Sequence, residues 1–176
     1  TQLEGVKSDV VVPDRYSYID IGEKDYDNPL PWDKIRAADY ETWDGYIDFE
    51  KTISNSKARM AQSNQLQLID NYAKWLKSRR DDTQWSLSYD DYKERVERGE
   101  EEAKRFDAMD EYTSNLAFQS LPYEVQLFDQ DTILKKKRER WHKNLSKDVY
   151  VEEAISVLED LKINNIRRIK VASIKN

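Results

Sequence analysis

Hydrophobic side chains recur every three or four positions through much of the chain after residue 44, which is the spacing of one face of an α-helix. Two successive segments show this period on either side of a break at residues 63–64. Their apolar positions are Tyr46, Phe49, Ile53 and Met60 in the first segment, and Leu66, Ile69, Tyr72, Ala73 and Leu76 in the second. The pattern predicts two consecutive helices separated by a short interruption.

Further helices are predicted in the second half of the chain. Ser88 followed by Asp91 is close to a capping box and opens a long helix that runs to Met109. Gly99 inside it costs about 1 kcal/mol relative to alanine, so we expect a kink or a close contact there. A basic helix is predicted at 132–145. A final helix, capped by Asp148, carries Val151, Ile155, Leu158 and Leu161 at helical spacing.

Strand-like patterns are short and scattered. Residues 3–12 end in a valine triplet before Pro13, which predicts a strand closed by proline. No strong partner strand follows, so we interpret it as a strand cut from a sheet upstream of Thr1. Residues 84–89 alternate and are compatible with a single strand. The tail from Ile166 is compatible with a strand or a frayed end.

The predicted fold class is therefore mainly α, a helical domain with a few short strands, preceded by one strand of an upstream sheet. Residues 1–14 hold that strand. Residues 15–43 form a turn-rich connecting segment, with a short helix after Pro31. Residues 44–176 form the helical domain.

Composition narrows the function classes. The 176 residues carry a net charge of −6, which makes the chain a poor general binder of nucleic acid or anionic membranes. No apolar run approaches the ~20 residues that a bilayer crossing requires. The absence of cysteine excludes disulfides, thiolate zinc sites and a cysteine nucleophile. The 5 Trp, 11 Tyr and 4 Phe supply large core anchors, so the chain is not expected to be disordered.

No residue cluster predicts an active site, a metal site or a cofactor. His142 lacks a recognisable nucleophile motif, and adjacent glutamates such as Glu152 and Glu153 diverge on a helix rather than converge on one ion. The best basic patch lies on the predicted helix at 132–145. It predicts either a solvated face or a docking surface for an acidic partner, formed by Lys135, Lys136, Lys137, Arg138, Arg140 and Trp141.

Two stretches carry a more specific resemblance. The first contains Gly5, Val6, Asp9 and Val10, and the second, GEKDYDNPLPWDKI, starts at Gly22. Together they resemble the end of the protease domain and the start of the C-terminal region in tail-specific proteases, also called carboxy-terminal-processing peptidases. Looser similarity continues through SKARMAQSNQLQ, QWSLSY and DVYVEEAISVLEDL, and residues 113–145 depart most from the family.

The resemblance implies a bacterial, periplasmic serine endopeptidase that recognises apolar C-terminal tails through a PDZ domain and cleaves with a Ser–Lys dyad. Both lie upstream of this chain in the family, so no catalytic residue is carried over to it. The implied role here is to brace the protease platform and help wall the substrate chamber. The implied partners are the upstream domains, protein substrates and an adaptor protein.

The loop in the second stretch is then interpreted as the domain junction. Prolines limit its conformations and a tryptophan buries a large face against the protease platform. The junction residues are predicted to be Leu30, Pro31, Trp32 and Ile35.

Two other hypotheses remain open from the residues alone. One is a freestanding helical adaptor that binds protein partners, which pairing of the 5–12 strand with 84–88 or 166–174 would favour. The other is an independent hydrolase built on carboxylates and His142.

Overall fold

The computed structural model describes residues 8–20, 22, 25–30, 38–39 and 47–174, with side chains described up to residue 163. Helices dominate these residues: α1 (Phe49–Gln62), α2 (Asn64–Asp81), α3 (Tyr89–Lys104), the short 3₁₀ helix η2 (Asp107–Glu111), α4 (Pro122–Val125), α5 (Thr132–Leu145) and α6 (Val149–Ile174). The predicted mainly α class is confirmed. Among the described residues, no helix combines the length and apolar composition that a bilayer crossing requires.

Side-chain caps set three helix boundaries; the sequence predicts the caps at Ser88 and Asp148, and a break at residues 63–64. Ser63 adopts an extended conformation between α1 and α2, and its hydroxyl accepts the N–H of Leu66. Ser88 caps α3 by accepting the N–H of Asp91. Asp148 accepts the N–H groups of Tyr150 and Val151 at 2.9 and 3.2 Å, which starts α6. Each cap satisfies backbone donors that the first helical turn leaves free.

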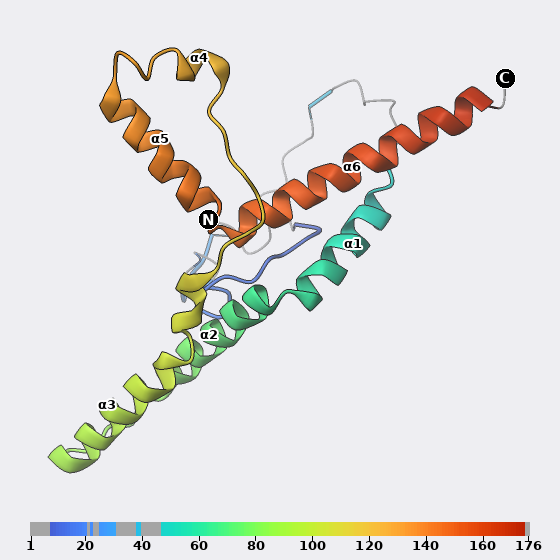
Figure 1. Ribbon diagram of the computed structural model, residues 1–176. Helices are drawn as coiled ribbons and strands as arrows, with labels where there is room; N and C mark the ends of the chain where they lie inside the picture. Colours follow the sequence, from blue (N-terminus) through green and yellow to red (C-terminus); the bar gives the residue numbers. More distant parts are fainter. Residues whose placement is uncertain (1–7, 21, 23–24, 31–37, 40–46, 175–176) are drawn as a thin grey trace.

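Helices α2 and α3 run side by side in opposite directions and form a projecting arm (Figure 1). Side chains bridge them: the indole N–H of Trp75 donates to Glu102 at 2.9 Å. The guanidinium of Arg79 lies over Gly99, where an added Cβ would come within 2.7 Å of it. The predicted close contact at Gly99 is confirmed.

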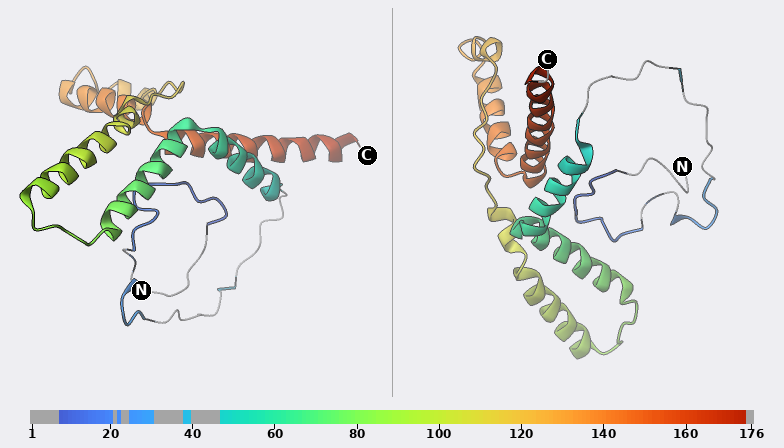
Figure 2. Two further views of the ribbon diagram at one scale, coloured as in Figure 1. Left: turned by 90° about the horizontal axis from the view of Figure 1, so that it is seen from below. Right: turned by 90° about the vertical axis from the view of Figure 1, so that its right-hand side faces the viewer.

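The arm joins a hub in which the start of α2, η2 and the start of α6 meet (Figure 2). Leu66 and Ala73 of α2 are buried there, together with Phe106 and Val149. The ring of Phe106 lies 5.0 Å from that of Tyr72, at 63°, which is an edge-to-face pair. The predicted long helix ends sooner than expected, because Met109 belongs to η2 rather than α3.

Helices α1 and α6 pack against each other through polar side chains. Ser56 and Thr52 are the buried residues of α1, and the Ser56 hydroxyl donates to Glu153 of α6 at 2.6 Å. Arg59 donates to Glu153 at 2.8 Å and to Asp160 at 2.6 Å. We call these five residues, with Asn55, the α1–α6 seam.

The apolar stripe predicted for the first helix does not supply its buried positions: Phe49 is 58% exposed, and Ile53 and Met60 are half-buried. Tyr46 lies outside the described residues. The buried positions are instead spaced i, i+4 and carry hydroxyls, because the facing helix offers carboxylates at this interface. A hydrophobicity pattern cannot identify such a face, which becomes favourable only once its polar groups are paired.

Two of the predicted strands are absent from the described residues. Residues 84–88 form an irregular loop and the tail up to Ile174 is helical, so no strand forms in either described segment. A lone strand has no ladder partner among these helices, and the helical alternative keeps the backbone bonded locally. Residues 8–12 also show no ladder within the described part of the chain, and their upstream sheet stays a prediction.

Candidate functional site

The N-terminal segment 8–20, which we call the strap, is bonded to two helices of the hub. The Tyr150 hydroxyl, at the start of α6, donates to the Pro13 carbonyl at 3.1 Å. The Tyr18 hydroxyl donates to the Asp70 carboxylate of α2 at 2.7 Å. The guanidinium carbon of Arg15 lies 5.9 Å from the Tyr72 ring centre. These contacts fix the path along which the chain enters the helical domain.

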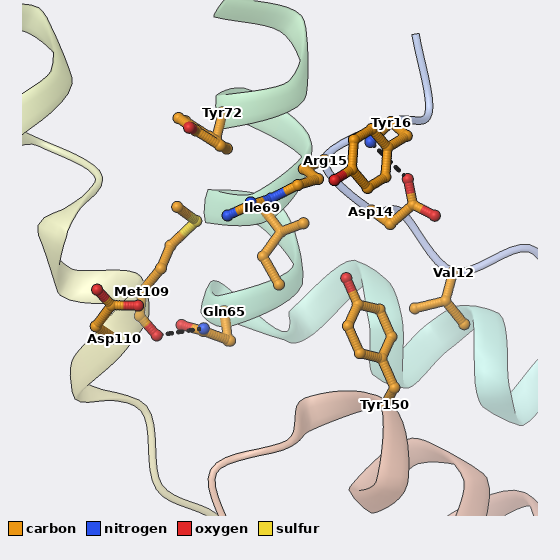
Figure 3. Close-up of a pocket in the computed structure, with 10 residues that line it drawn as sticks. All are labelled: Val12, Asp14, Arg15, Tyr16, Gln65, Ile69, Tyr72, Met109, Asp110 and Tyr150. Atoms are coloured by element: carbon orange, nitrogen blue, oxygen red, sulfur yellow. Dashed lines mark hydrogen bonds between the residues drawn. The ribbon is translucent and has the colours of Figure 1, made fainter. Parts of the chain in front are cut away.

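A local turn shapes the strap between its two attachment points. The Asp14 carboxylate accepts the N–H of Tyr16 at 2.7 Å, and the Asp14 carbonyl accepts the N–H of Ser17 at 3.2 Å. Aspartate favours this arrangement because its short side chain bonds the backbone two residues on. The turn places Arg15 and Tyr16 beside α2, as Figure 3 shows.

A cavity of about 580 Å³ opens between the strap, α2, η2 and α6 (Figure 3). Its apolar and aromatic walls are contributed by Val12, Tyr16, Ile69, Tyr72, Met109 and Tyr150. Asp14, Arg15, Gln65 and Asp110 supply the polar groups. The Gln65 side chain also donates to the Met109 carbonyl at 3.1 Å, which ties η2 to α2 on one side of the cavity. An apolar concavity with a polar rim is typical of a site that receives a side chain or small ligand.

The ionisable groups at the strap contacts keep the protonation states that their hydrogen bonds require. Hydrogen bonds from Lys74 and then from Tyr18 lower the pKa of Asp70. The bond to Asp70 raises the pKa of Tyr18, and burial, together with the nearby Asp14 carboxylate, raises the pKa of Tyr150. Both phenols therefore stay protonated at neutral pH and serve as hydrogen-bond donors.

The structure attaches the strap at positions that the sequence did not single out. Leu30, one of the predicted junction residues, is 61% exposed, while Pro31, Trp32 and Ile35 lie outside the described residues. The observed contact pairs Tyr150 with Pro13 across 137 positions of sequence. No local pattern signals a partner at that separation, so only the tertiary structure reveals it.

The basic patch predicted at 132–145 lies on α5, away from the arm (Figure 1). Its exposed members are Lys135, Lys136, Lys137, Arg140 and Trp141. Arg138 is half-buried and forms an ion pair with Glu124, which is 8% exposed.

Arg138 therefore holds the short α4 against α5, and its guanidinium carbon lies 5.2 Å from the Trp141 ring centre. The remaining basic side chains face solvent. Their docking role stays a prediction.

The hydrolase candidates are engaged in structural contacts. His142 packs its ring 5.7 Å from that of Trp141, and no hydrogen bond joins it to Ser120 in the cavity they share. Glu152 accepts the hydroxyl of Tyr112, and Glu153 is bonded within the α1–α6 seam. Among the described residues, no three histidine, aspartate or glutamate side chains gather in an arrangement suited to a metal ion.

Comparison with known families decides the identity of the chain. Residues 16–162 match the family described as "C-terminal domain of tail specific protease (DUF3340)". The chain belongs to this family. The match begins inside the strap and ends in α6. It covers the Tyr18 contact, the arm and the hub, whereas Pro13, Asp14 and Arg15 precede the matched residues. The family resemblance expected from the sequence is thereby confirmed.

A curated relative agrees with this assignment. The tail-specific protease of Haemophilus influenzae is 34% identical over 115 residues, which is 63% of this chain and 16% of the relative. The chain therefore spans about one sixth of the length of that protease. No solved structure matches the chain.

Proposed function

We propose that this tail-specific protease C-terminal domain is non-catalytic and braces the protease platform while helping to wall the substrate chamber. The parent enzyme in this proposal is a periplasmic serine endopeptidase that cleaves proteins with apolar C-terminal tails. Its Ser–Lys dyad and PDZ domain lie upstream. Family membership and the small share of the Haemophilus influenzae relative that the chain covers support this division of labour.

The observation that carries the bracing role is the attachment of the strap to two helices. Residues Pro13 and Tyr18 are bonded to α6 and α2, on either side of the Asp14 turn. A connecting segment held at two points transmits orientation, whereas a freely solvated linker does not. The upstream domains would therefore be held in a defined position relative to the helices.

The decisive experiment uses the full-length parent protease with Tyr18→Phe and Tyr150→Phe combined. Each change removes one hydroxyl donor and keeps the ring, so each bond loses about 1 kcal/mol. We expect unchanged cleavage of a short unstructured reporter peptide. We expect slower degradation of a whole protein substrate and earlier protease nicking within the strap, because the domains lose their fixed orientation.

Tyr89→Phe is the matched control, since this tyrosine is 74% exposed and no hydrogen bond involves its hydroxyl among the described residues. The bracing proposal fails if the double variant degrades protein substrates at the parent rate and its strap remains as resistant to nicking. Equal loss on the peptide and the protein would indicate a direct effect on the catalytic centre, which also contradicts the proposal.

The adaptor hypothesis receives no support from the fold. Its expected strand pairing does not occur, because residues 84–88 are irregular and the segment up to Ile174 is helical. The exposed basic residues of α5 are retained in the proposal as a surface for an acidic region of a substrate or partner protein.

A further inference from the structure

Two incomplete features of the structure lie next to each other at the N-terminal end. The first is the segment 8–12, whose backbone forms no hydrogen bond with any other described residue. Its side chains are valine-rich, and Val11 is 73% exposed. Unpaired backbone beside exposed branched aliphatic side chains is the state of a strand that lacks its neighbour.

The second feature is the apolar cavity between the strap and the hub. Val12 belongs to both features, because it ends the unpaired segment and lines the cavity. Ile69 and Met109 are half-buried across from it, and Tyr16 is 53% exposed at the edge. One protein segment placed against residues 8–12 would cover both the unpaired backbone and the cavity.

We propose that this cavity receives an apolar side chain from the protease part of the same polypeptide, from the strand or loop that lies beside residues 8–12. The inference rests on the proposed function and identifies this cavity as the place where the helical domain contacts the protease part. The ligand chemistry is a branched aliphatic or aromatic side chain, matched to walls made by Ile69, Met109 and Tyr72. Asp14, Arg15 and Asp110 stay at the rim as polar contacts.

Chain connectivity favours a side chain from the same polypeptide over one from a separate molecule. The seven residues before Ser8 span at most about 25 Å when fully extended, so whatever precedes them is tethered close to the cavity. A tether of this length gives an effective concentration in the millimolar range. A second copy of the protein or a free substrate peptide has to compete with that tethered group.

The test places a photocrosslinker in the full-length parent protease. Tyr16 is replaced by benzoylphenylalanine, a longer relative of tyrosine that keeps the ring at the edge of the cavity. Tyr89, exposed on the arm, receives the same replacement as a control. After irradiation, we expect Tyr16 to yield an intramolecular crosslink to a peptide upstream of Thr1, and Tyr89 to yield none.

Crosslinks from Tyr16 to a second copy or to a substrate peptide would overturn the inference, and so would crosslinks confined to this chain. If Tyr89 or Trp141, labelled in the same way, reached the upstream domain while Tyr16 did not, the domains would contact one another elsewhere. That result would be consistent with the proposed bracing function, but it would show that the cavity does not receive the upstream side chain. If no labelled position reached the upstream domain, both proposals would fail.

A second variant tests the cavity itself. Ile69→Arg places a guanidinium in the apolar wall, and Asn71→Arg adds the same charge at an exposed position on the same helix. Because an apolar side chain and an unpaired guanidinium do not share a small cavity favourably, we expect the Tyr16 crosslink to fall roughly tenfold in the first variant. The Asn71 control should retain it. Equal crosslinking in both variants would overturn the inference, provided helical circular dichroism shows both folded.

Discussion

Arg59 is the residue whose replacement most directly tests the polar packing of α1 against α6. Its guanidinium donates to the carboxylates of Glu153 and Asp160. The Asn55 side-chain amide also donates to the Asp160 carboxylate, at 3.0 Å. We predict that Arg59→Met destabilises the chain at neutral pH. Methionine retains an apolar stem of similar shape, so the change removes the charge and its hydrogen bonds rather than the packing.

The magnitude follows from how deeply each group is buried. Removing one partner of a fully buried ion pair costs about 3–5 kcal/mol. The Arg59 side chain is 34% exposed, so the cost must be discounted. Glu153, however, remains buried in the variant and keeps only the Ser56 hydroxyl as a hydrogen-bond partner among the described residues. We assign about 2 kcal/mol to the Glu153 contact and about 0.5 kcal/mol to the more accessible Asp160 contact. The free energy of unfolding should fall by roughly 2–3 kcal/mol.

The pH dependence gives the prediction a second, independent readout. Burial by itself raises the pKa of Asp160, but hydrogen bonds from Arg59 and Asn55 outweigh it, and the pKa ends below its ordinary value. A lowered native pKa contributes stability above the unfolded value, near 4, and that stability is lost as the pH falls through the native pKa. Arg59→Met removes the share of this contribution that Arg59 supplies, while the Asn55 bond remains. The difference between variant and parent should therefore be largest at pH 7 and shrink toward pH 3 by up to about 0.5 kcal/mol, the amount assigned to the Asp160 contact.

Urea unfolding followed by helical circular dichroism measures both quantities. Arg98→Met is the control, because Arg98 pairs with Glu94 on the exposed face of α3, where the side chains are 64% and 72% exposed. It should lose less than about 0.5 kcal/mol. A loss below about 1 kcal/mol in Arg59→Met, or a loss that stays constant with pH, would refute the assignment of the seam as a stabilising ionic contact.

Three further outcomes are expected. Gly99→Ala should leave the free energy of unfolding nearly unchanged, because a gain of about 1 kcal/mol in helix propensity is offset by the displacement of Arg79. In an Arg79→Ala background the same change should stabilise the fold by about 1 kcal/mol. Equal effects in both backgrounds would contradict the contact between Arg79 and Gly99. Trp32→Ala should lower the melting temperature of the parent by several degrees, and an unchanged melt would remove Trp32 from the junction. Lys136→Glu with Lys137→Glu should weaken capture and proteolysis of partner proteins without changing stability, and unchanged pull-down would end the docking hypothesis for α5.

Local physical chemistry was enough to predict much of the secondary structure. Ser63, Ser88 and Asp148 satisfy the first backbone donors of their own helices, so their positions fix the helix starts regardless of what packs outside. Gly99 indicated a kink or a close contact, because a glycine inside a helix needs a compensating reason, and the structure shows the close contact. The opening motif stretches indicated the family, which the match over residues 16–162 confirms.

The tertiary structure decided what lies across each helix face. Sequence periodicity could not reveal that α1 buries Ser56 and Thr52 instead of its apolar stripe, since a hydroxyl is favoured inside only when a partner such as Glu153 faces it. Nor could it reveal that Tyr150 meets Pro13, because contacts across long sequence separations depend on how the helices are arranged rather than on local propensity. The sequence determined the elements and the family, and the fold decided the seam, the strap attachment and the cavity between them.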